Sequence, residues 1–74
     1  NSDEALRILD EAWRRFPNEL EIGFALATIL RDRGERERTT LVIEELRNRF
    51  PDNAAVDTLF KSISNMNQGK SMRR

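Results

Sequence analysis

The sequence contains neither cysteine nor histidine among its 74 residues. Without cysteine the chain has no disulfide and no thiolate ligand for a metal. Without histidine it lacks the usual general base, the Ser-His-Asp and Cys-His catalytic arrangements and every Glu-x-x-His metal motif. These absences predict a protein that is not an enzyme and that has neither a metal site nor a cofactor.

Glycine is also scarce, and the three glycines are too far apart to form a Gly-rich phosphate loop. Catalysis would therefore have to rest on carboxylates alone. Three adjacent carboxylate pairs could in principle act as acid and base, namely Asp3/Glu4, Asp10/Glu11 and Glu44/Glu45. Each pair falls on the polar side of a predicted helix, which argues against a catalytic pocket around it.

An excess of one charge sign and a long apolar run are missing as well. The 13 basic and 13 acidic residues cancel, so no net field attracts nucleic acid or an anionic membrane. No apolar run approaches the roughly 20 residues that span a bilayer. The arginine-rich segment 31–38 is either a phosphate-binding patch or a solvated face with i,i+4 ion pairs, and the balanced charge favours the solvated face. We expect no nucleic-acid or membrane partner.

The length of the chain allows one small domain, because a chain of this size buries only roughly 60% of its unfolded surface. The sequence begins with asparagine rather than methionine, which favours a processed chain or a piece cut from a longer protein. The compartment is left open by the composition.

Apolar residues recur at helical spacing in four segments, which predicts an all-α fold of four helices. The expected ranges are 3–16, 18–33, 35–49 and 54–66, followed by a disordered polar tail at 67–74. Pro17 and Pro51 end the first and third helices, and Gly34 closes the second in a left-handed conformation. Asn18 and Glu21 form a capping-box-like pair, and Asp52 or Asn53 caps the fourth helix.

The expected core follows from the same spacing. The first helix has one wide apolar face, the second is apolar almost all round, and each of the other two has an inner side. These faces comprise Ala5, Leu6, Ile8, Leu9, Ala12, Trp13 and Phe16; Leu20, Ile22, Phe24, Ala25, Leu26, Ala27, Ile29 and Leu30; Leu41, Val42, Ile43, Leu46 and Phe50; and Val56, Leu59, Phe60 and Ile63.

A repeat links the two halves of the chain. The sequence FPNE at 16–19 returns as FPDN at 50–53, and the second proline follows the first by 34 positions. The same shift brings apolar positions onto apolar positions in both helices of the unit, which chance matching of one dipeptide would not produce. The matched pairs include Leu9 with Ile43, Ala12 with Leu46, Phe16 with Phe50, Ile22 with Val56 and Ile29 with Ile63.

This pattern resembles the tetratricopeptide repeat (TPR) family, whose unit is a 34-residue helix-turn-helix. Leu26, Ala27, Leu30, Gly34 and Pro51 match the family's pattern within residues 20–53. The resemblance implies a short right-handed solenoid of stacked antiparallel helical hairpins over residues 1–66, as a C-terminal fragment of a longer TPR-containing protein. Residues 1–19 would be the second helix of a partial repeat, 20–53 a full repeat and 54–66 a C-terminal capping helix.

Two positions depart from the family's pattern. Gly23 stands where the family usually has tryptophan or a large aliphatic residue, and Thr39 stands where it has alanine. A glycine inside a helix costs about 0.5–1 kcal/mol relative to alanine. We expect Gly23 to make room for Trp13 of the neighbouring helix, with a hinge or a ligand contact as the alternative.

The resemblance implies a protein-interaction module that binds a peptide or helix of another protein in a concave groove. Phe24 is the expected apolar anchor and Arg31 the polar one, unless Phe24 packs into the core and Arg31 only pairs with Glu35. The expected groove residues are Glu21, Phe24, Thr28, Arg31 and Asp32 from the second helix, with Ala55, Thr58, Ser62 and Asn65 from the fourth.

The alternative is a structural terminal piece that caps or dimerises a larger protein and binds nothing in its groove. Lys61 stands where Ala27 would recur, which predicts that no further helix covers the fourth one. In the TPR pattern Ala5, Leu9 and Ala12 pack on a helix that this chain lacks, so a larger parent protein or a homodimer would cover them. An exposed Phe24 would favour the binding module, and a fully packed one the structural piece.

Overall fold

The computed structural model describes the backbone of residues 2–72 and the side chains of residues 2–65. Four helices form in chain order: α1 (Ser2–Arg15), α2 (Leu20–Asp32), α3 (Arg36–Arg49) and α4 (Ala54–Met72). The first three lie within two residues of their expected bounds at each end. The all-α fold with four helices is confirmed.

The backbone of α4 is helical beyond residue 66, whereas the sequence predicted a disordered polar tail from residue 67. The side chains of 66–72 and the whole of residues 73–74 lie outside the part of the chain that the structure describes. The predicted disorder of the tail therefore stays a prediction.

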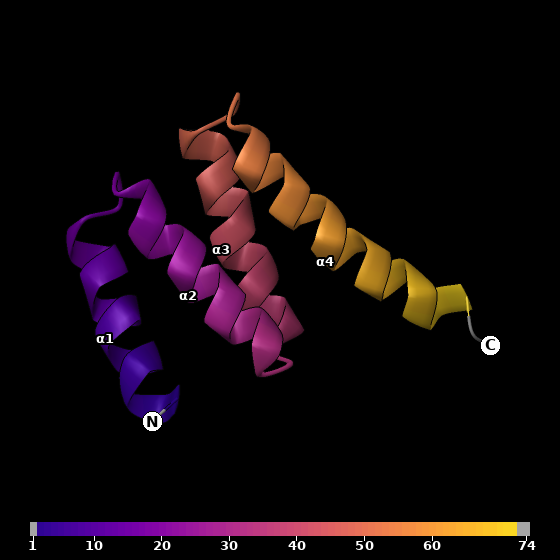
Figure 1. Ribbon diagram of the computed structural model, residues 1–74, viewed down its shortest axis with the longest axis horizontal. Coiled ribbons are helices and arrows are strands. Elements are labelled where there is room, and N and C mark those ends of the chain that lie inside the picture. Colours follow the sequence, from indigo (N-terminus) through magenta and orange to yellow (C-terminus); the bar gives the residue numbers. More distant parts are fainter. Residues whose placement is uncertain (1, 73–74) are drawn as a thin grey trace.

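The helices pack sequentially as neighbouring pairs, α1 on α2, α2 on α3 and α3 on α4 (Figure 1). Figure 1 shows α1 and α4 at opposite ends of this row, separated by α2 and α3. The principal extents of the molecule are 40 × 32 × 14 Å, and the shortest is little more than the diameter of about 10–12 Å of one helix. The helices therefore form a row and do not close into a four-helix bundle.

The local structure repeats with the sequence. The end of α3 follows that of α1 by 34 residues (49 − 15), and the start of α4 follows that of α2 by the same interval (54 − 20). The two turns also share their hydrogen bonds: Phe16 N–H donates to the Ala12 carbonyl at 2.8 Å, and Phe50 N–H donates to the Leu46 carbonyl at 2.7 Å. The FP sequences therefore form equivalent turns.

The turn between α2 and α3 depends on Gly34. Its φ of +80° lies in the left-handed region, as expected from the sequence. This conformation lets the Glu35 N–H reach back to the Leu30 carbonyl at 3.0 Å and so closes the end of α2.

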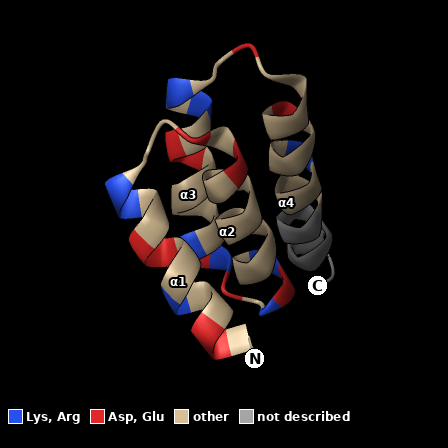
Figure 2. Cartoon of the chain, turned by 60° about the vertical axis from the view of Figure 1, so that its left-hand side comes forward, with Lys and Arg blue, Asp and Glu red and all other residues tan. Residues whose placement is uncertain are grey.

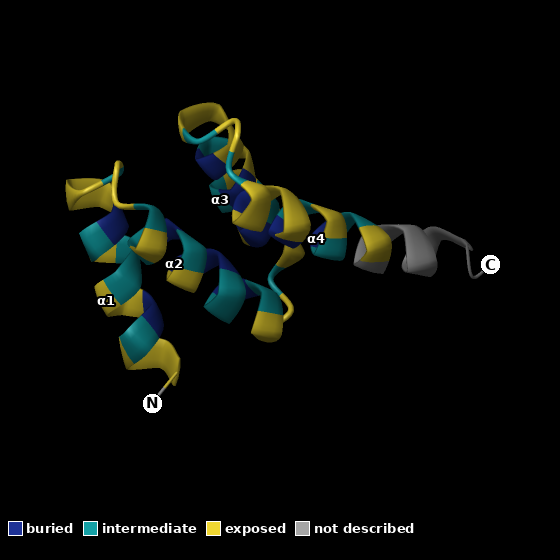
Figure 3. Cartoon of the chain, turned by 45° about the horizontal axis from the view of Figure 1, so that its top comes forward, coloured by how far each residue is buried: buried dark blue, intermediate teal, exposed yellow. Residues whose placement is uncertain are grey.

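The core lies along α2, which α1 and α3 cover from two sides. Leu26, Ala27 and Leu30 are fully buried, which confirms that this helix is packed on more than one side. In Figure 3 the buried residues lie where neighbouring helices face one another. The remaining apolar core residues are Leu6, Trp13, Ile43, Leu46, Val56, Leu59 and Ile63.

Three large apolar residues expected in the core are exposed instead, together with the small Ala25. Leu41 is 65% exposed because it lies about 160° around α3 from the buried Ile43, at about 100° per residue. Ile8 on α1 and Phe16 directly after α1 are 53% and 54% exposed, whereas Leu6 and Trp13 are the buried residues of this helix, which packs on α2. The predicted burial of these four side chains was wrong.

The expected capping box at the start of α2 is also wrong. Glu19 is the N-cap residue and makes no side-chain capping hydrogen bond. The Asn18 Oδ1 atom accepts a hydrogen bond of 3.0 Å from Arg49 at the end of α3, so a distant residue takes the predicted capping group. At the start of α4, Asn53 Oδ1 accepts from the Val56 N–H at 3.1 Å, as expected.

Candidate functional site

A shallow hollow of about 290 Å³ lies between α2 and α4. Leu20, Glu21, Phe24 and Ala25 line it from α2, and Ala55 lines it from α4. The four residues of α2 have the spacing i, i+1, i+4, i+5, which places them on one side of the helix over a little more than one turn. Glu21 is the one charged side chain among these lining residues, so the hollow is mainly apolar.

Phe24 is half-buried and has two roles in the structure. It packs against the core cluster from the side of α2, and it also lines the hollow. An exposed Phe24 would favour a binding module and a fully packed one a structural piece, so the intermediate burial lies between these two outcomes. The ring is held by packing and still offers part of its surface.

Thr28 lies one turn beyond Phe24 on α2 and is half-buried. Its Oγ1 atom donates a 2.8 Å hydrogen bond to the carbonyl oxygen of Phe24. The hydroxyl proton is thus engaged within α2, and Thr28 is not among the residues that line the hollow.

Arg31 and Asp32 lie at the far end of α2 and pair with each other at 3.4 Å. Seven residues separate Arg31 from Phe24, which is about 10 Å along a helix, so this pair is not part of the hollow. Glu35 pairs with Arg33 at 3.0 Å and with Arg38 at 3.6 Å. The alternative to a groove role for Arg31, a pair with Glu35, is therefore not found.

On α4, Thr58 is exposed and Ser62 is half-buried, one and two turns after Ala55. Neither lines the hollow. Of the expected groove residues, the structure brings together Glu21, Phe24 and Ala55.

Sequence reasoning missed Leu20 and Ala25 as groove residues because it assigned both to the core. Ala25 is exposed and Leu20 is half-buried. The i, i+1, i+4, i+5 spacing with Glu21 and Phe24 is the signal that could have identified them.

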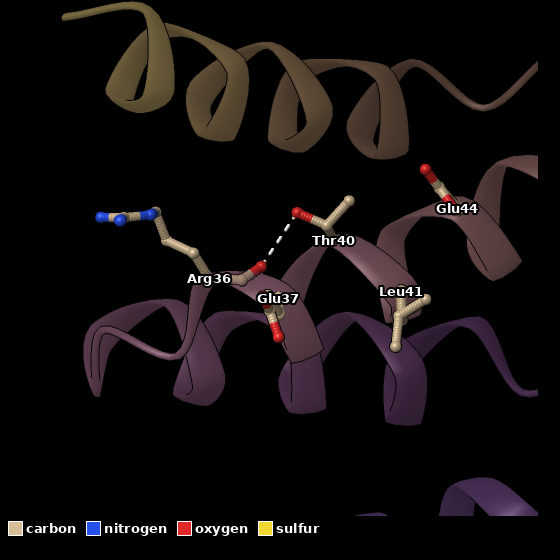
Figure 4. A pocket seen from close by; sticks show the side chains of 5 residues that line it. All are labelled: Arg36, Glu37, Thr40, Leu41 and Glu44. Carbon is tan, nitrogen blue, oxygen red and sulfur yellow. Dashed lines mark hydrogen bonds between the residues drawn. The ribbon is translucent and has the colours of Figure 1, made fainter. Parts of the chain in front are cut away.

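A second, larger hollow of about 550 Å³ lies on α3 (Figure 4). All five residues that line it come from this one helix: Arg36, Glu37, Thr40, Leu41 and Glu44. In Figure 4 their side chains fan out instead of converging, and the Thr40 hydroxyl donates to the Arg36 carbonyl oxygen at 2.9 Å. A wall made by one helix does not enclose a ligand. We therefore favour the hollow between α2 and α4 as the candidate binding site.

Charged residues of both signs alternate over the described helices (Figure 2). Arg33 joins two distant segments: its Nη1 atom donates to Asp3 Oδ1 at 2.8 Å and to Ser2 Oγ at 2.9 Å, and its Nε atom donates to Glu35 at 3.0 Å. The hydrogen bonds to Glu35 and Asp3 raise the pKa of Arg33. Arg31, Arg33 and Arg38 thus form ion pairs with neighbouring acids, but none of these pairs has the expected i,i+4 spacing.

Two further tests of the described residues bear on function. No three Asp or Glu side chains among them gather closely enough to hold a metal ion. Within the same part of the chain, no helix has the length and apolar character to cross a membrane.

Comparisons with protein families, with curated proteins and with solved structures found no match to this chain. The resemblance to TPR proteins therefore rests on the pattern of residues in the sequence alone.

Proposed function

We propose that this chain is a non-catalytic, TPR-like module that binds a peptide or helix of another protein in the hollow between α2 and α4. In this proposal α2 and α3 form one full repeat of a right-handed solenoid. The helix α1 is then the second helix of a preceding repeat, and α4 is the first helix of a following one. The 34-residue interval between equivalent helix starts supports this arrangement.

The proposal depends on one observation above all: the two helices that line the hollow are equivalent in the repeat. In the repeat, α2 and α4 are equivalent, and Ala55 occupies the position that Glu21 has 34 residues earlier. Helical-repeat proteins bind partners on the extended surface that successive equivalent elements build. An apolar hollow between two equivalent helices has the position expected for such a surface.

The size of the hollow restricts its occupant. Its volume of about 290 Å³ is at the lower limit of small-molecule pockets, which range over about 300–1,000 Å³. We infer that it accepts one large apolar side chain of a partner, and that Glu21 favours a lysine or arginine beside that side chain. Burial of one such side chain contributes only about 1.5–3 kcal/mol, so further contacts along α2 and α4 are needed for useful affinity.

A displayed peptide library, selected on the whole chain, tests this proposal. Dissociation constants of the selected peptides would be compared for the wild type, Ala25→Gln and Leu41→Gln by fluorescence polarisation. Ala25 is exposed at the edge of the hollow and glutamine is a good helix former, so this substitution obstructs the hollow while keeping the fold. We expect at least about tenfold weaker binding by Ala25→Gln, which corresponds to about 1.4 kcal/mol.

The Leu41→Gln control changes an exposed residue of α3 that does not line this hollow, and we expect it to bind as the wild type does. Glu21→Lys should selectively weaken peptides that carry a basic residue. Failure to select any peptide, or selection of peptides that bind Ala25→Gln as tightly as the wild type, would contradict the proposal.

A second candidate function is that of a structural terminal piece without a groove ligand. The observation that favours it is the difference between two equivalent positions: Ala27 is fully buried under its neighbours, whereas Lys61 is exposed and pairs with Asp57 at 3.4 Å. A charged surface of this kind suits the end of an array. Under this alternative, the peptide selection yields no ligand specific for the hollow.

A further inference from the structure

We propose that the outer face of α1 binds a second copy of this chain, with the two α1 helices antiparallel. The face consists of Ala5, Ile8, Leu9, Ala12 and Phe16, here called the α1 stripe. It lies apart from the hollow between α2 and α4, and this inference does not depend on the proposed peptide binding.

The α1 stripe is apolar and only partly covered. The helix α1 lies at one end of the row, where α2 covers the side that carries Leu6 and Trp13 (Figure 1). Ile8 and Phe16 are 53% and 54% exposed, and the other three residues of the stripe are half-buried. The spacing i, i+3, i+4, i+7, i+11 places all five on one face of the helix.

The repeat shows what kind of element fits such a stripe. Four of the five positions 34 residues later lie on α3 and the fifth, Phe50, is the C-cap residue of α3, which packs against α2. There Thr39, Ile43 and Leu46 are at most 1% exposed. The apolar residues of the α1 stripe therefore have the spacing of a surface that an antiparallel helix can cover.

The order of side chains along the stripe makes it complementary to itself. Small Ala5 is followed by large Ile8 and Leu9, then by small Ala12 and large Phe16. In an antiparallel pair centred between residues 10 and 11, Phe16 of one copy lies against Ala5 of the other, and Leu9 lies against Ala12. Large side chains then meet small ones in these pairs, which favours close packing about a two-fold axis.

The charges beside the stripe favour the same orientation. Glu4 and Arg15 are exposed and flank the stripe on the same side of α1, and Glu4 also pairs with Arg7 at 3.3 Å. An antiparallel arrangement brings Glu4 of each copy near Arg15 of the other. In a parallel two-fold pair the flanks that carry Glu4 and Arg15 would lie on opposite sides of the interface, so these charges would not pair between the copies.

The expected dimer is weak and reversible. A helix of 14 residues is about 21 Å long, and two such helices bury less than the about 1,200 Å² that typical stable complexes reach. We therefore expect a dissociation constant above about 1 μM. The monomer and the dimer should both be populated at concentrations that biophysical methods reach.

Sedimentation equilibrium of the whole chain at protein concentrations up to about 1 mM tests the proposal, because a weak dimer is populated at such concentrations. We expect a monomer–dimer equilibrium for the wild type, and a dissociation constant at least about tenfold higher for Ile8→Glu and for Phe16→Glu. The matched control is Leu41→Glu, because Leu41 is the third large apolar side chain found exposed among the described residues. Circular dichroism would check that each variant is folded.

A charge exchange tests the orientation. Glu4→Arg and Arg15→Glu should each weaken the dimer, and the two together should restore it, because the antiparallel pair then regains opposite charges. A wild type that stays monomeric at 1 mM would overturn the proposal and leave the stripe to a helix of another protein. Dimerisation that survives Phe16→Glu but is lost in Leu41→Glu would also overturn it. If the double variant of Glu4 and Arg15 dimerises no better than the single variants, the antiparallel orientation is wrong.

The same variants separate this inference from the peptide-binding proposal. Substitutions in the α1 stripe should leave the affinity for groove peptides unchanged, and Ala25→Gln should leave the monomer–dimer equilibrium unchanged. Either proposal can therefore fail without the other.

Discussion

Gly23 lies under the ring of Trp13 at a distance that leaves no room for a side chain. A Cβ atom on Gly23 would be 2.7 Å from both Cη2 and Cζ3 of Trp13, and 2.8 Å from Cδ2 of Leu46. The residue thus marks the point where α1 and α3 approach α2 from two sides. This contact confirms the expectation that Gly23 makes room for Trp13, and it explains the glycine inside a helix.

Gly23→Ala should destabilise the protein, although alanine is the better helix former. The gain in helix propensity is about 1 kcal/mol, whereas overpacking a core costs about 1–3 kcal/mol and here involves two helices. We expect the free energy of unfolding to fall by about 1–2 kcal/mol, measured by urea denaturation with circular dichroism. In a double-mutant cycle, Trp13→Leu should reduce this penalty. A variant more stable than the wild type would show that the contact is not tight.

Gly34→Ala should also destabilise, for a different reason. No heavy atom lies within 4 Å of a Cβ built on Gly34, so the cost comes from its φ of +80° alone. We expect a loss of about 1–2 kcal/mol for alanine and a smaller loss for asparagine, which tolerates the left-handed region better. Urea titrations of the two variants measure this difference, and equal stability of Gly34→Ala and the wild type would contradict it.

The two equivalent N-caps allow a prediction from one repeat to the other. Asn53→Ala should cost about 1 kcal/mol because it removes the hydrogen bond to the Val56 N–H. Glu19 occupies the same position one repeat earlier, has extended backbone and makes no side-chain cap. Glu19→Asn should therefore stabilise the protein by about 0.5–1 kcal/mol in thermal or urea unfolding.

Asn18→Ala is the control for these cap variants, because Asn18 bonds the exposed side chain of Arg49 and does not cap α2. Its effect should stay within about 0.5 kcal/mol. If Asn18→Ala cost as much as Asn53→Ala, the N-cap assignment at α2 would be wrong.

Leu41 and Leu46 provide the same chemical change in two environments of one helix. Leu46 is fully buried, and Leu46→Ala should cost about 2–5 kcal/mol. Leu41 is 65% exposed, so Leu41→Ala should change stability by no more than about 0.5 kcal/mol. Urea midpoints of the two variants at equal concentration check the contrast. Similar losses would mean that α3 turns a different face to the core.

Sequence reasoning succeeded where neighbouring residues decide the outcome. The bounds of α1, α2 and α3, the left-handed Gly34 and the Asn53 cap all follow from propensity and from groups a few residues apart. It failed at Asn18, where Arg49 of another helix takes the side-chain oxygen. It failed at Leu41 because residues 41–43 are all apolar, so the sequence does not show which of them lie on the buried side. Burial there depends on which side of α3 faces α2.

The candidate site was only partly predictable for the same reason. Glu21 and Phe24 were expected in the groove, whereas Leu20 and Ala25 belong to it because α4 passes beside that end of α2. Likewise, Ile8 and Phe16 share the apolar character of Val42 and Phe50, but only the second pair is half-buried and packed against the core.

By itself the sequence determined four helices, the turns between them and the 34-residue interval, because propensity, proline, glycine and apolar spacing act over a few residues. Only the tertiary structure decided which helical faces are covered, where the hollow lies and which apolar stripe stays open. Burial is a property of contacts between segments distant in the chain, and equal residues in equivalent helices differ in exposure when one of them lacks a neighbour.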